Sequence, residues 1–570
     1  MRRKFALVWL FCTSIFIHGQ NLLSIPDTIS GTIFNLNVLD TSKVFYPGFT
    51  TKTYGINSKY LGPTLFLNKG DSVSLQVNNQ LTDTTTIHWH GLHVAAMNDG
   101  GPHNFILPNS IWNPKFKVRD QAAMYWYHPH LHMKTNKHVS LGAAGLIIVR
   151  DSVEKSLNIP RKYGIDDFPL VIQSKCFDTN KQIIFGNASD SVILVNGTLN
   201  PYLPIPAQVV RLRILNASPE RVYNLGLQGN LTFYQIGTDG GLLDAPVALS
   251  RLRLAPGERA EILVDFSGKM GQTINLMSFA SELPSAIYGA SQPGMGAGQT
   301  IPGYTSNSLN GTNIKIISFS VTAQSTSPIV TIPSSLTINS PYNTASANAF
   351  KNLTFTPVNM GPTAIQGPFL INNTSFDMDV INYTIPFNNI EIWTLTNQTP
   401  IAHPFHIHDV QFYITEINGA APPANMKGRK DVVLVPGGGQ TVKFITKFET
   451  FCDSMAPYMY HCHMLTHEDD GMMGQFVVKC PNSVGLAENN WGTNNFLVYS
   501  NHADKSINIK SNQLISEVKL IDISGKIIYE SDKISNTEFI IENKNQASGI
   551  YFIDLKIANK IYHKKIILFD

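Results

Sequence analysis

The sequence has little net charge, few cysteines and no long apolar run beyond its first residues, and each shortage excludes a class of protein. Lysine and arginine number 43 against 40 aspartate and glutamate, so the formal charge of +3 is too small for binding to a phosphate backbone or an anionic membrane. We expect no nucleic-acid partner. Five cysteines form no disulfide framework, and the sequence leaves open whether Cys176, Cys452 and Cys480 form a disulfide. No apolar run after residue 20 reaches the roughly 18 residues of a membrane helix.

What is present is typical of a large exported β protein. Hydrophobic residues make up 43% and charged residues 15%, with 41 glycines and 32 prolines, which is unlike a helical or a disordered chain. At roughly 150 residues per domain, 570 residues predict about three to four domains. Three basic residues at positions 2–4 precede an apolar run from Phe5 to Ile17, and the small residue Gly19 follows. This pattern predicts a signal peptide at residues 1–19.

The histidines are gathered in two places. Of 17 histidines, eight lie between His88 and His138 and six between His403 and His467, whereas residues 139–402 contain none. Because side chains alternate across a strand, each His-x-His pair in a strand directs two imidazoles to one spot. Eight converging imidazoles exceed what one zinc ion takes, so we expect several metal ions, although imidazole suits copper, zinc, iron and nickel alike. The four pairs are His88/His90, His128/His130, His406/His408 and His461/His463.

The sequence H-C-H at residues 461–463 indicates copper. Cys462 points to the strand face opposite to its two neighbours, so one strand serves two sites. A cysteine, two histidines and a long axial methionine form the blue-copper ligand set; Cys462, His467 and Met472 supply three of these ligands, and His403 can complete it. Only a few bonds would separate the thiolate from the metals held by the flanking histidines. The arrangement couples one-electron oxidation to a multi-metal site.

Four motifs resemble the signatures of three-domain multicopper oxidases: H-W-H-G at 88–91, Y-H-P-H at 127–130, H-P-F-H-I-H at 403–408 and H-C-H-M-L-T-H-E-D-D-G-M at 461–472. The resemblance covers about residues 25–480. It implies four copper ions per chain. The type 1 ligands it implies are His403, Cys462, His467 and axial Met472; those of type 2 are His88 and His406; those of the type 3 pair are His90, His128 and His463 on one ion and His130, His408 and His461 on the other. Met473 is the alternative axial ligand, disfavoured by the spacing in the family.

Two acids join the candidate site by their position. Asp99 lies in a D-G-G-P run, and Glu468 follows His467 directly. In the family such acids relay protons, and the reduction of dioxygen to water consumes protons that carboxyl groups beside the cluster can deliver. The alternative for both is an exposed acid in a loop. The remaining histidines of the two clusters are expected at the surface or behind the ligands: His93, His103, His132 and His138.

Similar strands recur along the chain and predict repeated domains. The segments V-S-L-Q-V-N at 73–78, V-R-L-R-I-L-N at 210–216 and I-E-I-W-T-L-T-N at 390–397 alternate in polarity and end in Asn, and each resembles the same cupredoxin strand. We therefore predict an all-β fold with three cupredoxin-like Greek-key β-sandwich domains at residues 21–160, 161–325 and 326–485. The family arrangement implies that the copper cluster lies between the first and third, with the type 1 copper in the third and the second as a spacer.

The C-terminal residues 496–570 are predicted to form a further small β-sandwich domain. The segments G-K-I-I-Y at 525–529, S-G-I-Y at 548–551 and K-K-I-I-L at 564–568 resemble C-terminal sorting domains of type IX secretion. Such domains usually open with a Tyr-Pro-Asn-Pro-like segment, which Tyr499 does not begin here, and a carbohydrate-binding or structural β module is the alternative. We expect a secreted or cell-surface protein that uses the type IX secretion machinery, or a periplasmic one if the tail is not a sorting domain.

The leading interpretation is a laccase-like oxidase, monomeric, that passes electrons from a reducing substrate to dioxygen. The alternative is a non-catalytic secreted protein that binds or sequesters copper, which has no need for a thiolate between two cluster histidines. A copper nitrite reductase would not require four histidine pairs. Phenols or aromatic amines and Cu(I) are equally suitable substrates, because the methionines that select Cu(I) are only scattered here, among them Met295, Met455, Met459 and Met464.

Overall fold

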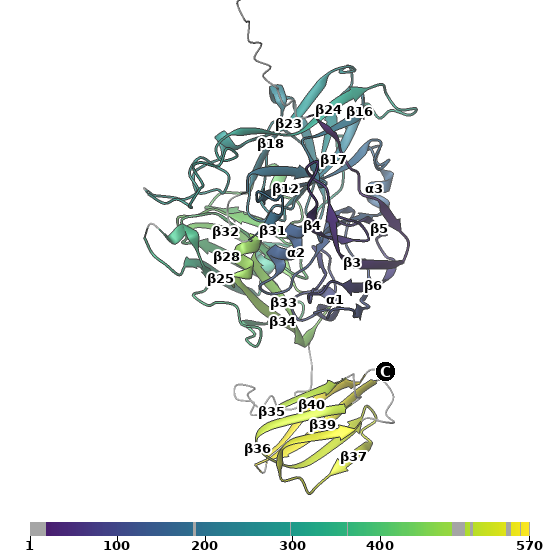
Figure 1. The fold of residues 1–570 in the computed structure, drawn as a ribbon, viewed down its shortest axis with the longest axis vertical. Helices are drawn as coiled ribbons and strands as arrows, with labels where there is room; N and C mark the ends of the chain where they lie inside the picture. Colours follow the sequence, from purple (N-terminus) through teal and green to yellow (C-terminus); the bar gives the residue numbers. More distant parts are fainter. Residues whose placement is uncertain are drawn as a thin grey trace, which may run out of the picture. The chain divides into compact units, whose positions relative to one another are not determined.

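The computed structural model describes residues 19–185, 190–296, 298–361, 363–480, 496–501, 506–542, 549–558 and 560–568. Except for Gly19, the predicted signal peptide lies outside these residues. The chain divides into two compact units, one on each side of residue 481. Strands predominate in both units (Figure 1), so the predicted all-β class is confirmed. Throughout the ranges just given, no helix has the length and apolar character needed to cross a membrane.

The first sandwich, purple in Figure 1, shows how alternation builds the core. In β6 (Ser72–Gln80) every second side chain is buried, and these side chains join one apolar cluster with both sheets of the sandwich. One sheet holds, in order of pairing, β2 (Thr28–Ser30), β5 (Thr64–Asn68), β11 (Gly145–Arg150), β10 (Ala123–His128) and β7 (His88–His90). The other sheet holds β4 (Thr51–Ile56), β3 (Ile33–Lys43), β6 and β8 (Ile111–Trp112), and β9 (Lys115–Lys117) also pairs with β6. The helices α1 (Ala96–Asp99), α2 (Thr135–Leu141) and α3 (Ser152–Ser156) lie in its connections.

The second sandwich, blue to teal in Figure 1, also takes in the first strand of the chain. β1 (Asn21–Leu22) pairs with β16 (Pro201–Pro206), although the sequence assigns residue 21 to the first domain. The first sheet continues with β24 (Asn313–Thr322), β23 (Thr273–Phe279), β18 (Tyr223–Leu227) and β21 (Leu252–Leu254). The second sheet holds β15 (Thr198–Leu199), β14 (Val192–Val195), β12 (Asp167–Phe177), β17 (Val209–Asn216), β22 (Arg259–Asp265), β19 (Phe233–Thr238) and β20 (Gly241–Leu249), with β13 (Ile183–Ile184) beside β12. Two 3-10 turns, η1 (Gln228–Asn230) and η2 (Ala280–Glu282), complete it.

The third sandwich, green in Figure 1, carries the second histidine cluster. One sheet holds β26 (Phe369–Ile371), β25 (Ala349–Pro357), β28 (Ile390–Asn397), β32 (Gln440–Lys447) and β30 (Tyr413–Ile417). The other holds β27 (Tyr383–Pro386), β34 (Met473–Lys479), β33 (Asp453–Cys462), β29 (His403–Ile407) and β31 (Val432–Val435). The connections hold α4 (Leu465–Asp469) and the turns η3 (Thr344–Ser346), η4 (Ala364–Gln366) and η5 (Ala424–Met426).

A buried asparagine recurs at the end of one strand in each sandwich. β6, β17 and β28 pair in parallel with β3, β12 and β25 respectively. The side chains of Asn79, Asn216 and Asn397 each accept a backbone N–H two residues further on and donate to two carbonyl oxygens. The sequence repeat placed the first of them at Asn78, but the odd-numbered residues of β6 face the core, so Asn79 is the equivalent residue.

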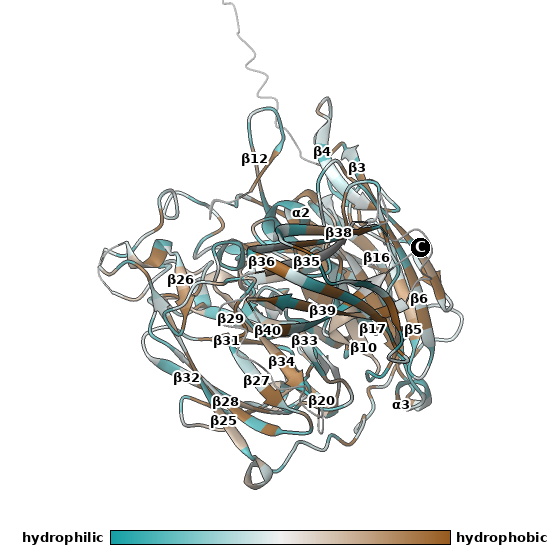
Figure 2. Cartoon of the chain, turned by 90° about the horizontal axis from the view of Figure 1, so that it is seen from below, coloured by the Kyte–Doolittle hydropathy of each residue, from teal (hydrophilic) through white to brown (hydrophobic). Residues whose placement is uncertain are grey.

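The C-terminal unit is built around one long strand. β36 (Ser506–Asp522) pairs with β35 (Phe496–Asn501) and β38 (Asn536–Glu542) mainly over its first half, and with β37 (Ile527–Ser531) and β39 (Gly549–Ile557) over its second. β40 (Lys560–Leu568) pairs with β39. Hydrophilic and hydrophobic residues alternate along these strands (Figure 2), and the hydrophobic ones gather in one core.

A disulfide joins Cys452 to Cys480 with a Cα–Cα distance of 5.0 Å, which answers the question that the sequence leaves open. Cys176 and Cys462 are free thiols. The bridge connects the residue before β33 to the residue after β34. The last motif, at residues 461–472, begins at the end of β33 and ends just before β34.

Candidate metal centre

Two paired strands of the first sandwich supply four of the predicted histidines. β7 lies at the edge of its sheet and pairs antiparallel with β10, which places His128 opposite His88. Trp89, between His88 and His90, points to the other face and packs into the core. His130 follows β10 by two residues. The two-residue period of the strands thus brings four imidazoles to one edge of the sheet.

Two paired strands of the third sandwich supply the rest. In the register of β29 and β33, His406 faces His461 and Phe405 faces Cys462. His408 and His463 follow directly after these strands. Because neighbours in a strand point to opposite faces, Cys462 faces away from the cluster that its two flanking histidines enter.

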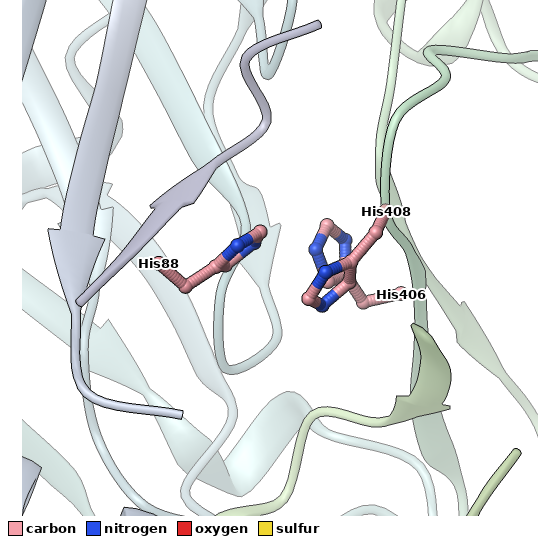
Figure 3. Close-up of side chains that lie close together, drawn as sticks. All are labelled: His88, His406 and His408. Carbon is pink, nitrogen blue, oxygen red and sulfur yellow. The ribbon is translucent and has the colours of Figure 1, made fainter. Parts of the chain in front are cut away.

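The histidines of the two sandwiches stack on each other in pairs. His90 lies 3.8 Å from His406, centroid to centroid, and His88 lies 3.8 Å from His408, with interplanar angles of 9° and 18°. Figure 3 shows His88 entering from one side and His406 and His408 from the other. The cluster is therefore complete only when the two sandwiches meet.

The ring nitrogens of the cluster form three all-histidine groups, and two of these groups share His408. Within each group all candidate ligand atoms lie within 4.8 Å of one another. The groups are His88, His406 and His408; His90, His128 and His463; and His130, His408 and His461. The structure thus brings together the sets that the family resemblance implies, and it also places His408 near the first pair.

The cluster histidines fix one ring nitrogen and leave the other free for a metal ion. His88 Nδ1 donates to the carbonyl oxygen of Asp99 at 2.9 Å, and His406 Nδ1 donates to that of Asp431 at 2.8 Å. Within the described part of the chain, the buried Nε2 atoms of both have no hydrogen-bond partner. A fixed second nitrogen orients a metal-binding imidazole, and an all-imidazole donor set suits copper. The residues present therefore fit the copper ions that the sequence predicts.

Burial keeps most of the cluster histidines neutral. It lowers the pKa of His130 and His463 to about 3, and neighbouring imidazoles contribute to the shift. It also lowers the pKa of His90, His128, His406 and His408 well below the usual value. A neutral ring keeps the lone pair that a metal ligand needs.

A second, smaller group surrounds the thiol of Cys462. Its Sγ lies 3.5 Å from His403 Nδ1 and 3.7 Å from His467 Nδ1, and these two nitrogens are 3.2 Å apart. Met472 is fully buried, and its backbone bonds to both Cys462 and His467. Met473, the alternative, begins β34 in register with His461. We call His403, Cys462 and His467 the thiol group. It has the cysteine and both histidines of the blue-copper set within reach of one ion.

Both candidate acids are buried beside the cluster, so the alternative of an exposed loop acid is wrong for each. Asp99, in α1, accepts a hydrogen bond at Oδ2 from His408 Nδ1 at 2.7 Å. Glu468, in α4, has Oε2 3.1 Å from His461 Nδ1 and Oε1 3.4 Å from His130 Nδ1. Each carboxyl group therefore contacts a predicted ligand at Nδ1, whereas the Nε2 atoms of His130, His408 and His461 approach one another inside the cluster.

Sequence reasoning missed an ion pair behind the cluster. Asp431 Oδ1 accepts from His90 Nε2 at 3.1 Å, and both oxygens of Asp431 bind Arg259 at 2.5 Å. Arg259 starts β22 of the second sandwich and is fully buried. No local pattern marks either residue, because their partners are distant in the sequence.

The four histidines outside the motifs have other partners. His93 bonds to Asp409, and His103 bonds to Gln475. His132 packs edge-on against Phe376. His138 is fully buried and lies 3.1 Å from Thr85 Oγ1. None of the four belongs to the described groups of ligand atoms.

A cavity of about 620 Å³ lies beside the thiol group, with His467 in its wall. Apolar side chains from all three sandwiches line it, among them Met133 of the first, Tyr288 and Ile301 of the second and Ile401 of the third. The second sandwich, predicted as a spacer, therefore forms part of the cavity. Three acids line it as well: Glu220, Asp469 and Asp470.

Cupredoxin-like sandwiches that hold a cysteine–histidine group next to an eight-histidine cluster define a class of copper proteins. Residues 39–154 and 344–482 match sequence models described as multicopper oxidase, and residues 484–568 match a domain of unknown function. The multicopper oxidase Mco of Staphylococcus haemolyticus is 33% identical over 444 residues, which is 76% of this chain and 86% of that protein. The chain belongs to the multicopper oxidase family.

Other proteins of similar sequence identity include a cell division protein as well as oxidases. The cell division protein FtsP of Escherichia coli is 33% identical over 441 residues, or 76% of this chain and 87% of that protein. Among solved structures, the laccase-like multi-copper oxidase CueO of Ochrobactrum sp. has a TM-score of 0.70 and 31% identity, covering 80% of this chain and all of that one. McoA of Aquifex aeolicus has a TM-score of 0.71 and 30% identity, covering 81% and 100%.

Proposed function

We propose that the protein is an oxidase that accepts electrons one at a time from a reducing substrate beside His467 and delivers them to dioxygen at the histidine cluster, yielding water. The observation that carries this proposal is the end of β33, where Cys462 joins one group of ligand atoms and its neighbours His461 and His463 join two others. Few covalent bonds separate the two sites. A protein that only stores copper has no use for this connection.

The proposed loading is four copper ions per chain: His403, Cys462, His467 and Met472 would hold one, and the cluster histidines would hold three. When bound, copper supplies the one-electron redox steps that the side chains cannot perform. The chain holds and orients the ligands through their second nitrogens. It also excludes water, since the eight cluster histidines are at most 1% exposed.

We assign the handling of protons to Asp99 and Glu468. Reduction of dioxygen to water consumes protons, and each carboxyl group lies within reach of the cluster through a histidine that it contacts. In the described part of the chain, Asp99 Oδ1 has no hydrogen-bond partner, which leaves a lone pair free to take up a proton.

The reducing substrate is proposed to bind in the cavity beside His467. A volume of about 620 Å³ suits a small organic molecule. Aromatic and aliphatic walls favour a phenol or aromatic amine, whereas the three acids and the buried Met464 suit Cu(I). Both classes of reductant remain within the proposal.

A non-catalytic copper-binding role is the second candidate function. It is favoured by the cell division protein FtsP, which is as similar in sequence as the Mco oxidase. The complete set of ligand groups supports the oxidase instead.

We further propose that the chain is exported and acts as a monomer, secreted or at the cell surface. The Cys452–Cys480 disulfide supports this, because such bonds persist in oxidising compartments. The type IX secretion machinery is the proposed partner of the C-terminal unit.

Oxygen uptake by the copper-loaded protein, measured with a phenol, bilirubin and Cu(I), tests the function. Cys462→Ser should remove the blue absorption and slow substrate oxidation by roughly a thousandfold or more, because the thiolate link is lost. Met270→Leu, at an exposed position that lines neither cavity, should leave both unchanged. A protein that binds four copper ions and takes up no oxygen with any of the reductants would support the non-catalytic candidate.

A further inference from the structure

A buried lysine without a partner lies next to the substrate cavity. Lys175, in β12, is 2% exposed, and its Nζ has no hydrogen-bond partner among the residues that the structure describes. An ammonium group carries three N–H donors and no acceptor. Leaving all of them unbonded in a protein interior is unfavourable, so the position requires an explanation.

Lys175 lines a side chamber of about 30 Å³ that adjoins the main cavity. Four residues line both spaces: Asn136, Phe185, Glu220 and Tyr288. A volume of this size admits a water molecule or one small polar group, but not an aromatic ring. The chamber is therefore suited to the end of a molecule whose larger part occupies the main cavity.

The two acids of the chamber are already bonded. Asp190 is held by Arg221 through two hydrogen bonds of 2.6 Å. Glu220 accepts from the hydroxyl group of Thr466. Burial raises the pKa of Glu220 to about 7, which weakens it as a counter-ion for Lys175. The amine is thus the donor that remains free for a ligand.

One carboxyl group of the main cavity, that of Asp469, is already bound to backbone donors. Asp469 is turned to the backbone N–H groups of Thr135 and Asn136, at 2.9 and 3.0 Å. Burial lowers the pKa of Lys175 to about 7, and an anion beside it favours the charged form.

We propose that the side chamber at Lys175 binds the carboxylate of an aromatic reductant whose phenol ring lies in the main cavity beside His467. This inference rests on the proposed oxidase function and narrows its substrate class to phenols that carry a carboxylate. A charge-assisted hydrogen bond from the amine would fix one end of the substrate and direct its ring towards His467.

The first test compares ferulate with its methyl ester on the four-copper protein. Lys175→Met should raise KM for ferulate about tenfold or more, with kcat nearly unchanged and no effect on methyl ferulate. Lys443→Met is the matched control, because Lys443 lines neither the main cavity nor the side chamber and its ammonium is bound to Glu416 at 3.0 Å. Equal changes for both substrates, or no change for either, would overturn the proposal.

Two further measurements keep the inference separate from the oxidase function. If the wild-type protein oxidises neither compound, the oxidase proposal fails. Calorimetric titration with ferulate still tests the subsite in that case, because Lys175→Met should weaken binding and Lys443→Met should not. Thermal unfolding gives the second measurement. Lys175→Met should raise the melting temperature by a few degrees, since it removes a buried amine that has no hydrogen-bond partner among the described residues. A lower melting temperature would show that Lys175 is structural and would refute the subsite.

Discussion

At the scale of single residues, Glu468 joins the thiol group to the histidine cluster. It follows His467 and contacts His461 and His130. Glu468→Gln keeps the size of the side chain but removes its ability to release a proton, so reoxidation by dioxygen should slow by about 10²-fold or more while anaerobic reduction of the blue copper keeps its rate. Stopped-flow absorbance of the two half-reactions measures this. Glu416→Gln, at a half-buried pair with Lys443, is the control, and equal slowing of both half-reactions in Glu468→Gln would refute the relay.

Arg259 is a second residue whose role can be isolated. Arg259→Met leaves Asp431 buried and unpaired behind His90, which should cost about 3 to 5 kcal/mol and lower the copper content of the cluster, while the blue absorption remains. Arg213→Met is the matched control, because Arg213 is a buried arginine of the same sheet whose partners are Asp167 and Glu261. Metal analysis and absorbance spectra decide the matter; copper loss in both variants alike would mean that Arg259 acts only on stability.

The sequence predicts the residues of the site that obey a local rule. His-x-His pairs and the H-C-H segment follow from the two-residue period of a strand, and the structure brings their side chains together as that period requires. Asp431, Arg259 and Lys175 obey no such rule. Asp431 and Arg259 pair with each other across two sandwiches, and Lys175 has no hydrogen-bond partner among the described residues. Both features depend on the tertiary fold.

At the scale of elements, the repeat of strands ending in Asn predicts three related sandwiches, and the hydrogen bonds of Asn216 and Asn397 explain it. The amide closes the loop that follows the strand, so an aliphatic residue cannot replace it without leaving buried backbone groups unbonded. The assignment of Asn78 instead of Asn79 shows the limit. Two adjacent asparagines carry the same pattern, and only the register of β6 decides which one faces the core.

The disulfide closes the loop of chain that carries the H-C-H segment and the other ligands of the last motif. Between Cys452 and Cys480 lie β33, α4 and β34, with five of the predicted copper ligands. Replacing both cysteines with serine should lower the free energy of unfolding by about 3 to 4 kcal/mol, from the entropy of closing a loop of this length. Denaturant unfolding followed by fluorescence and by blue absorbance measures this loss. Cys176→Ser is the control, and an unchanged midpoint in the double variant would contradict the prediction.

At the scale of the whole molecule, the histidine-free second sandwich contributes to both sites. Its Arg259 lies behind the cluster, and its Tyr288 and Glu220 line the cavity beside His467. The composition of residues 139–402, which contain no histidine, predicts a spacer domain. It does not predict these contacts, because they arise only when three sandwiches close around one centre.

The C-terminal unit allows the last prediction, since it has a core of its own and none of its described residues belongs to a group of candidate metal ligands. A chain that ends at residue 487 keeps the disulfide and all predicted ligands, so its copper content, blue absorption and kcat/KM should lie within about twofold of the full chain. Export should separate from catalysis: the segment from residue 482 onward, fused to an unrelated carrier in a host with type IX secretion, should carry it to the cell surface. Fractionation and copper analysis give the two readouts. Loss of copper on truncation would show that the C-terminal unit stabilises the oxidase part, and retention of the fused carrier in the periplasm would leave the unit as a structural β module.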